Sequence, residues 1–244
     1  MLKSLITYLA DDEIILGYRD CEWTGVGPFL EEDLALSSIA QDEISHASIL
    51  YEIIGEPDDF VYKRNPNEFK NAYILELENY DYIFTLLRHL FYDEFDYIRI
   101  KSLLKSSNNE LKSRAEKIIL EEEYHLKHFR VLTKKLYQRE EGIKVLSECL
   151  DKHLWNLFTL FEADEEIKSI YDTDLFPLNY DEHLEMFYNV IKMDLPFYQF
   201  PEISEIKNYV KNLKSSRSGN KSEEFIKFYE TFTEVYRIEP NAKW

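Results

Sequence analysis

The residues of this chain whose types and spacing could do chemistry are two glutamate–histidine pairs with the pattern Glu-x-x-His. Glu43 and His46 form the first pair, and Glu122 and His125 form the second. Each pair has a further carboxylate about thirty positions upstream. The full candidate ligand set is Glu13, Glu43, His46, Asp93, Glu122 and His125. Four carboxylates and two imidazoles in this order are typical of a dinuclear iron or manganese site inside a four-helix bundle, which points to oxygen chemistry.

The two motifs gain weight from their surroundings, because a single Glu-x-x-His is common. With 31 glutamates and 6 histidines, a random order of this composition would contain roughly one copy. Residues i and i+3 project from the same face of a helix, and both copies fall on apolar stripes. Leu36 and Ile39 precede the first copy, while Ile118 and Phe129 flank the second. The sequence therefore places both copies on core-facing helix surfaces.

Carboxylates that face a core need compensation, since an isolated buried charge is costly or becomes protonated. Two divalent cations would balance the four candidate carboxylates. The carboxylates would then hold and bridge the two metals, and each histidine would bind one of them. Because the pattern contains no thiolate, two irons, or alternatively manganese, fit it better than a structural zinc. The alternative is a metal-free remnant of such a site.

Other polar residues near the motifs have a weaker claim. His89 lies one turn before the third-helix aspartate, and His128 lies one turn after the second motif histidine. Asp42 and Glu121 each lie four residues before a motif histidine and could orient its ring, although a solvated position is as common. The remaining histidines and both cysteines are expected to be ordinary core residues: His153, His183, Cys21 and Cys149.

The composition narrows the class of protein. A net charge of −18 argues against a nucleic-acid binder, which needs a basic surface to neutralise phosphates, and against anionic membranes. No apolar run approaches the roughly 18 residues that span a bilayer, and acidic residues at positions 11–13 interrupt any secretory signal. The two cysteines form no disulfide framework. We therefore expect a cytoplasmic protein that binds neither nucleic acid nor membrane.

The apolar periodicity predicts an all-α fold. Long helices are expected at about 3–23, 29–54, 78–105 and 109–138, with further helices at about 142–163, 181–194 and 222–236. Residues 106–109 should contain a helix N-cap. A crossover loop is expected at 56–77, irregular chain at 164–180 and a mobile loop at 215–221. Two short connections and one long one match a ferritin-like four-helix bundle with added C-terminal helices. The predicted domains are a bundle over 1–163 and a helical extension over 164–244.

Several stretches resemble the PaaC-type subunits of the phenylacetyl-CoA epoxidase (phenylacetate-CoA oxygenase) family. The matching stretches are residues 9–19, 22–23, 30–36, 90–93, 122–128, 154–155 and 160–162, followed by Gly219, Ser222, Glu223, Pro240, Ala242 and Trp244. The resemblance implies a ferritin-like fold and a complex of paired, related subunits. In that family the di-iron centre lies in a PaaA-type subunit, which epoxidises the ring of phenylacetyl-CoA with O₂, using electrons from a separate flavin and iron–sulfur reductase. The PaaC-type subunit is a structural partner with degraded ligand positions.

This chain departs from that pattern, because its candidate ligand set is complete. Gln41, Asp42, Glu43 and His46 resemble the motif of the catalytic subunit, and Asp93 matches its third-helix aspartate. The prediction is therefore a subunit of a multicomponent di-iron oxygenase that acts on an aromatic acyl-CoA. It would form a homo- or hetero-oligomer with a related ferritin-like subunit and draw on an external reductase. The alternative is a non-catalytic subunit that pairs with a catalytic homologue. Iron storage ranks below both, since the C-terminal extension has no role in a storage cage.

An acyl-CoA needs cations for its phosphates. Two basic stretches are candidates: Lys207 to Lys221, with Lys211, Lys214 and Arg217, and Lys134, Lys135 and Arg139. Both are expected to be ordinary surface charge, and no CoA-binding residue is assigned from the sequence.

Overall fold

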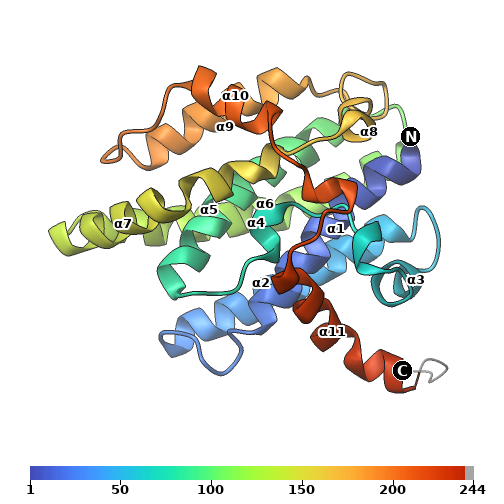
Figure 1. Ribbon diagram of the computed structural model, residues 1–244, viewed down its shortest axis with the longest axis horizontal. Coiled ribbons are helices and arrows are strands. Elements are labelled where there is room, and N and C mark those ends of the chain that lie inside the picture. Colours follow the sequence, from blue (N-terminus) through green and yellow to red (C-terminus); the bar gives the residue numbers. More distant parts are fainter. Residues whose placement is uncertain (240–244) are drawn as a thin grey trace. The chain divides into compact units, whose positions relative to one another are not determined.

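The computed structural model describes residues 1–239, and every regular element within that range is helical (Figure 1). The all-α prediction is therefore confirmed. Pro240, Ala242 and Trp244, which contribute to the family resemblance, lie outside the described residues. Within residues 1–239, none of the helices has both the length and the apolar character needed to cross a bilayer.

The chain packs as two compact units, and each is described by itself. Unit 1 consists of Met1 and Asn79–Leu213, and unit 2 of Leu2–Glu78 and Lys214–Trp244. These packing groups divide the chain at other positions than the predicted domains 1–163 and 164–244, and that prediction remains a prediction. Each unit contains one pair of long helices, and the two pairs supply the four long helices expected of a ferritin-like fold.

Unit 2 is built on the packed pair α1 (Leu2–Cys21) and α2 (Leu30–Tyr51). The crossover segment is more helical than predicted. It contains α3 (Pro57–Tyr62), the 3₁₀ turn η1 (Pro66–Glu68) and α4 (Tyr73–Glu76). After the excursion through unit 1, the chain returns with η3 (Ser216–Ser218) and α11 (Glu223–Ile238). Helix α11 packs against α3, η1 and α4, so both ends of the unit's sequence contribute to one core.

Unit 1 is built on α5 (Tyr82–Leu103) and α6 (Asn109–Leu136). Helices α7 (Glu140–Leu157) and α9 (Tyr180–Asp194) pack against α5. Shorter elements complete the unit: η2 (Phe158–Phe161), α8 (Glu165–Lys168) and α10 (Ile203–Lys211). The predicted N-cap between the long helices is Asn108, whose side chain accepts hydrogen bonds from the backbone N–H groups of Glu110 and Leu111.

One predicted loop is wrong in its character. Residues 215–221 were expected to form an exposed, mobile loop, but Ser215, Ser216 and Arg217 are buried and Arg217 is 0% exposed. The composition misleads because serine, lysine and asparagine are typical of solvated loops. Here these side chains instead satisfy buried carboxylates of unit 2, as described below.

Candidate metal centre

Half of the predicted ligand set meets inside unit 2. Glu13 comes from α1, and Glu43 and His46 come from consecutive turns of α2. All three side chains are buried, and each offers a ligand atom within 4.8 Å of those of the other two. The Oε2 atom of Glu13 lies 3.5 Å from Nδ1 of His46. We call these three residues half-site A.

The close approach of α1 and α2 depends on Gly17, one turn after Glu13. A Cβ atom at position 17 would lie 2.8 Å from Cγ1 of Ile44 and 3.0 Å from the backbone oxygen of Ala40. It would also lie 3.1 Å from Cβ of Glu43. Glycine therefore lets the backbone of α1 come near α2 at the level of the candidate ligands.

The other half of the set lies inside unit 1. Glu122 and His125 project from one face of α6, with Oε1 of Glu122 3.6 Å from Nδ1 of His125. Asp93 comes from α5, and all three side chains are 0% exposed. Burial raises the pKa of Asp93 to about 6, against the opposing effect of His89. The charge of Glu122 raises this pKa further and that of His125 lowers it, so the three groups interact electrostatically. We call them half-site B.

His89, whose role the sequence left open, contacts a candidate ligand directly. Its Nδ1 atom lies 3.2 Å from Oδ1 of Asp93, and its ring stacks on Phe129 with centroids 4.1 Å apart. The imidazole is thereby fixed on both its edge and its face. The Oδ2 atom of Asp93 is buried and has no hydrogen-bond partner among residues 1–239. One carboxylate oxygen is thus oriented by a histidine while the other is available to a cation.

The other neighbours of the motifs lie further toward solvent. His128 is half-buried beside the rings of Tyr124 and Phe129. Asp42 is half-buried and Glu121 is exposed. These positions agree with the solvated alternative for the two carboxylates more than with a role in orienting the imidazoles.

The donor types and their burial fit a metal site. Buried carboxylate and imidazole groups together are the ligands that iron and manganese prefer, and burying such carboxylates without a cation is costly. An orphaned buried oxygen on Asp93 adds to this fit. The protein therefore has a buried glutamate–histidine group that can hold a metal.

Comparison with known proteins agrees with the resemblance found in the sequence. The family model described as "Phenylacetic acid catabolic protein" (PaaA_PaaC) matches residues 1–244. The chain belongs to this family. A curated relative, one of the subunits of the 1,2-phenylacetyl-CoA epoxidase of Escherichia coli (strain K12), is 31% identical over 166 residues. The match covers 64% of this chain and 66% of the relative, just under two thirds of the relative's length. The all-helical fold agrees with the ferritin-like fold of the family.

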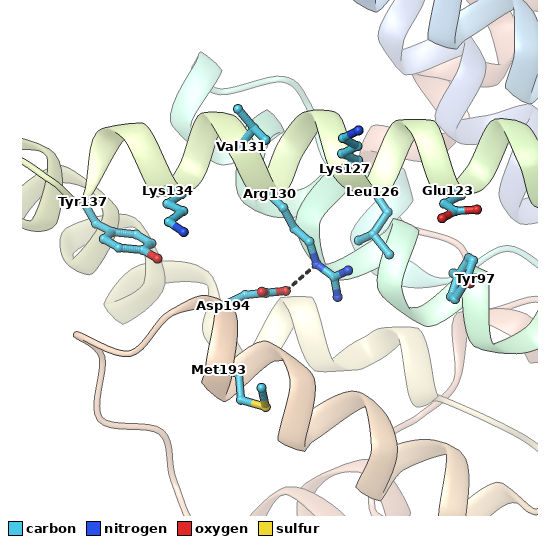
Figure 2. A pocket seen from close by; sticks show the side chains of 10 residues that line it. All are labelled: Tyr97, Glu123, Leu126, Lys127, Arg130, Val131, Lys134, Tyr137, Met193 and Asp194. Atoms are coloured by element: carbon cyan, nitrogen blue, oxygen red, sulfur yellow. Dashed lines mark hydrogen bonds and ion pairs between the residues drawn. The ribbon is translucent and has the colours of Figure 1, made fainter.

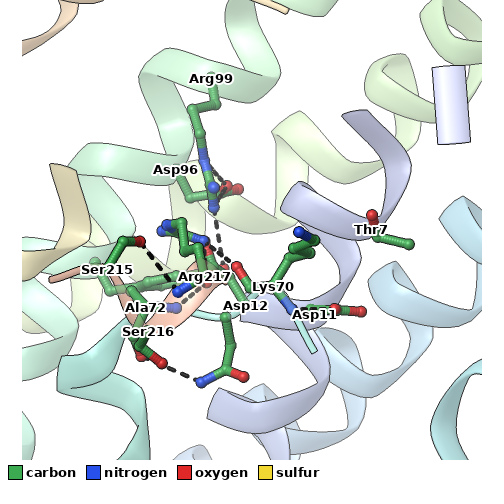
Figure 3. Close-up of polar contacts among 12 residues, drawn as sticks. Thr7, Asp11, Asp12, Lys70, Ala72, Asp96, Arg99, Ser215, Ser216 and Arg217 are labelled. Atoms are coloured by element: carbon green, nitrogen blue, oxygen red, sulfur yellow. Dashed lines mark hydrogen bonds and ion pairs between the residues drawn. The ribbon is translucent and has the colours of Figure 1, made fainter. Parts of the chain in front are cut away.

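Sequence reasoning missed the neighbours of Glu13 in this family member. Asp11 and Asp12 are both 0% exposed, although their acidic run is typical of a solvated stretch. Arg64 pairs with Asp11 through two contacts, Nη1–Oδ2 at 3.0 Å and Nη2–Oδ1 at 2.6 Å. Arg217 pairs with Asp12 through Nη1–Oδ1 at 2.9 Å and Nη2–Oδ2 at 3.0 Å (Figure 3). The one signal in the sequence was a run of three acids inside an otherwise apolar helix.

Unit 1 contains two neighbouring cavities that share Tyr97. The first, of about 520 Å³, is bordered by α5, α6 and α9 (Figure 2). Arg130 and Lys134 of α6 point into it toward Asp194 of α9, and Tyr137 lies beside Lys134. Arg130 also forms ion pairs with Glu94 and Asp194. The second cavity, of about 660 Å³, has a largely apolar lining from α5, α9 and residues 177–178. Both are large enough for a small-molecule ligand.

The two basic stretches considered for an acyl-CoA have different fates. In the first, Lys207 pairs with Asp181 and Glu185 at 3.3 and 2.7 Å. The expectation of surface charge is wrong for Arg217 and for Lys221, whose side chain is 2% exposed and lies 3.0 Å from Glu76. They are buried because they neutralise buried carboxylates. In the second stretch, Lys134 lines the 520 Å³ cavity.

Proposed function

We propose that this chain is a di-iron subunit of a multicomponent oxygenase that epoxidises the ring of an aromatic acyl-CoA, as in the phenylacetyl-CoA epoxidase type. The observation that carries the proposal is the burial of Glu13, Glu43 and His46 with ligand atoms within 4.8 Å of one another. Membership of the phenylacetic acid catabolic protein family supports the reaction class.

In this proposal half-sites A and B together hold two irons, or alternatively two manganese ions. Glu13, Glu43, Asp93 and Glu122 bind and bridge the metals, and each half-site histidine binds one of them. Two divalent ions balance four carboxylates, which removes the cost of burying them. Bound iron would supply the redox chemistry with O₂ that no side chain provides.

The chain's own residues would supply position and a dry environment. His89 holds one oxygen of Asp93 at 3.2 Å and thereby orients the other. Leu36, Ile39, Ile118 and Phe129 are each at most 1% exposed and exclude water from the faces that carry the motifs. These roles would pre-organise the ligands before any metal binds.

The test begins with protein purified without added metal, then loaded anaerobically with Fe(II) and mixed with O₂ in the presence of phenylacetyl-CoA and a reductant. Two metals per chain, a transient optical absorption and a ring-oxidised CoA product would support the proposal. Wild-type protein that takes up no iron would overturn it.

A second candidate is a non-catalytic subunit that pairs with a catalytic homologue. The observation that favours it is the name of the E. coli relative, which is one subunit of an epoxidase. Inert bound metal, together with a gain in activity when a catalytic homologue is added, would select this candidate. Both candidates require an oligomer with a related ferritin-like subunit, and the first also requires an external reductase. A cytoplasmic location remains a prediction.

For the substrate, we propose that the phosphates of the acyl-CoA bind in the 520 Å³ cavity of unit 1. Lys127, Arg130 and Lys134 line it within a chain of net charge −18, and tyrosines border it. Replacement Lys134→Glu should weaken the binding of coenzyme A about tenfold or more, because a hydrogen bond to a charged group contributes about 1.5–3 kcal/mol. Lys117→Glu, on the same helix but outside the cavity, is the matched control, and calorimetric titration is the measurement. Equal losses in the two variants would contradict this location.

A further inference from the structure

The return of the chain into unit 2 forms a buried strap, residues 215–222. Gly219 adopts φ +85°, a left-handed conformation that favours glycine. A Cβ atom there would lie 2.7 Å from the backbone oxygen of Asn67, so the strap lies tightly against the crossover segment. The strap is therefore shaped for this contact and differs from an exposed connection.

Arg217 is the centre of the strap. Besides its two contacts with Asp12, its Nη1 atom donates to the backbone oxygen of Lys70 at 2.6 Å. Its guanidinium carbon lies 4.6 Å from the ring centroid of Tyr8, one turn before Asp12 on α1. The backbone N–H of Ala72 donates to Asp12 Oδ1 at 2.8 Å. Arg217 thus joins α1, the crossover segment and the strap through one buried charge (Figure 3).

A second carboxylate fastens the rest of the strap. Lys221 Nζ lies 3.0 Å from Oε1 of Glu76, and the backbone N–H of Ser222 donates to Oε2 of Glu76 at 2.8 Å. Ser216 also hydrogen-bonds to this carboxylate. With Glu76 buried at the end of α4, the strap has two independent charged anchors.

We propose that Arg217 is a positioning residue for half-site A, an inference that rests on the proposed metal-binding function. The α1 run Asp11–Asp12–Glu13 brings three adjacent negative charges into the core. Arg64 and Arg217 neutralise the first two, so that the charge presented to metal by this run is that of Glu13. Without Arg217, the buried Asp12 charge would force α1 to shift or to take up a cation of its own.

The experiment compares Arg217→Met, Asp12→Asn and the double variant Asp12→Asn/Arg217→Met. Fe(II) affinity is measured anaerobically against a competing chelator, and circular dichroism checks the fold. Arg217→Met should weaken the binding of one of the two metals by roughly 10- to 100-fold, as loss of a supporting partner does. The double variant should recover to within about threefold of the wild type, because it removes both charges together. Lys207→Met, which breaks an exposed ion pair of unit 1, should change nothing.

The outcomes separate this inference from the proposed function. If the wild type binds no metal, the proposed function fails and this inference fails with it. If the wild type binds two metals and Arg217→Met binds them equally well, the inference alone is wrong. If Arg217→Met does not fold, the double variant decides: wild-type affinity supports neutralisation of Asp12, and a persistent loss overturns it.

Discussion

Helices α1 and α5 bury similar runs of acids but neutralise them in different ways. In α1, Asp11 pairs with Arg64 and Asp12 with Arg217, partners 53 and 205 positions away in the chain. In α5, Asp96 pairs with Arg99 three residues later on the same helix. The candidate ligand Asp93 likewise has its hydrogen-bond partner, His89, four residues earlier.

The difference teaches that half-site A depends on tertiary closure, whereas half-site B is supported largely by its own helix. Residues at i+3 and i+4 meet as soon as the helix forms. The arginine partners of α1 reach their carboxylates after the crossover segment and the strap have packed. Changes far from half-site A in sequence should therefore damage it, and changes near half-site B should damage that half.

The largest expected effect is loss of one metal from each half separately. His46→Ala and His125→Ala should each bind about one metal per chain where the wild type binds two, since each histidine is proposed to bind one ion. Elemental analysis after Fe(II) loading is the measurement. His128→Ala, one turn from His125 and half-buried, is the control that should keep both metals. Equal iron in His46→Ala and wild type would refute the site assignment.

Removing the local support of half-site B should have the next largest effect. His89→Phe keeps the stacking on Phe129 but loses the hydrogen bond to Asp93. The affinity for one metal should fall by roughly 10- to 100-fold, as measured with a competing chelator. His153→Phe, a ring substitution elsewhere in unit 1 beside Tyr80, should leave the affinity unchanged. The same loss in both variants would mean that His89 acts through general stability.

Gly17→Ala tests the helix contact on which half-site A depends. The added Cβ would lie 3.0 Å from the backbone oxygen of Ala40, so α1 and α2 must move apart. Overpacking of this kind lowers the free energy of unfolding by about 1–3 kcal/mol, which urea unfolding measures. Ser45→Ala, exposed on α2, is the control. An unchanged or raised stability of Gly17→Ala would show that the two helices have room to spare.

The smallest expected effect concerns acid and unit 1. Burial lowers the pKa of His183 to about 3, with repulsion from Arg99 adding to the shift. The folded pKa is below that of the unfolded chain, so this contribution to stability is complete above about pH 6.5 and is lost as the pH falls toward 3. The loss approaches about 1.4 kcal/mol per pH unit below 6.5. Urea unfolding at pH 7.5 and 5.5 should show a smaller drop for His183→Phe than for wild type, and identical drops would contradict this account.

Much of the fold could be predicted because the signals are local. The apolar periodicity placed the long helices within a few residues of their observed bounds, and Asn108 was recognisable as an N-cap. The grouping of Glu43 with His46 and of Glu122 with His125 follows from i, i+3 geometry. The strap could not be predicted in this way, because Ser216 and Arg217 have the composition of a solvated loop and are buried by partners elsewhere in the chain.

By itself, the sequence determined the helical class, the candidate ligands and the pairs that a single helix brings together. The tertiary structure decided which buried charges are neutralised by which cations: Asp11 by Arg64, Asp12 by Arg217 and Glu76 by Lys221. The physical reason is that helix geometry fixes neighbours at three and four residues regardless of context. A buried ion pair between distant segments exists through the packing of the segments that carry its two charges.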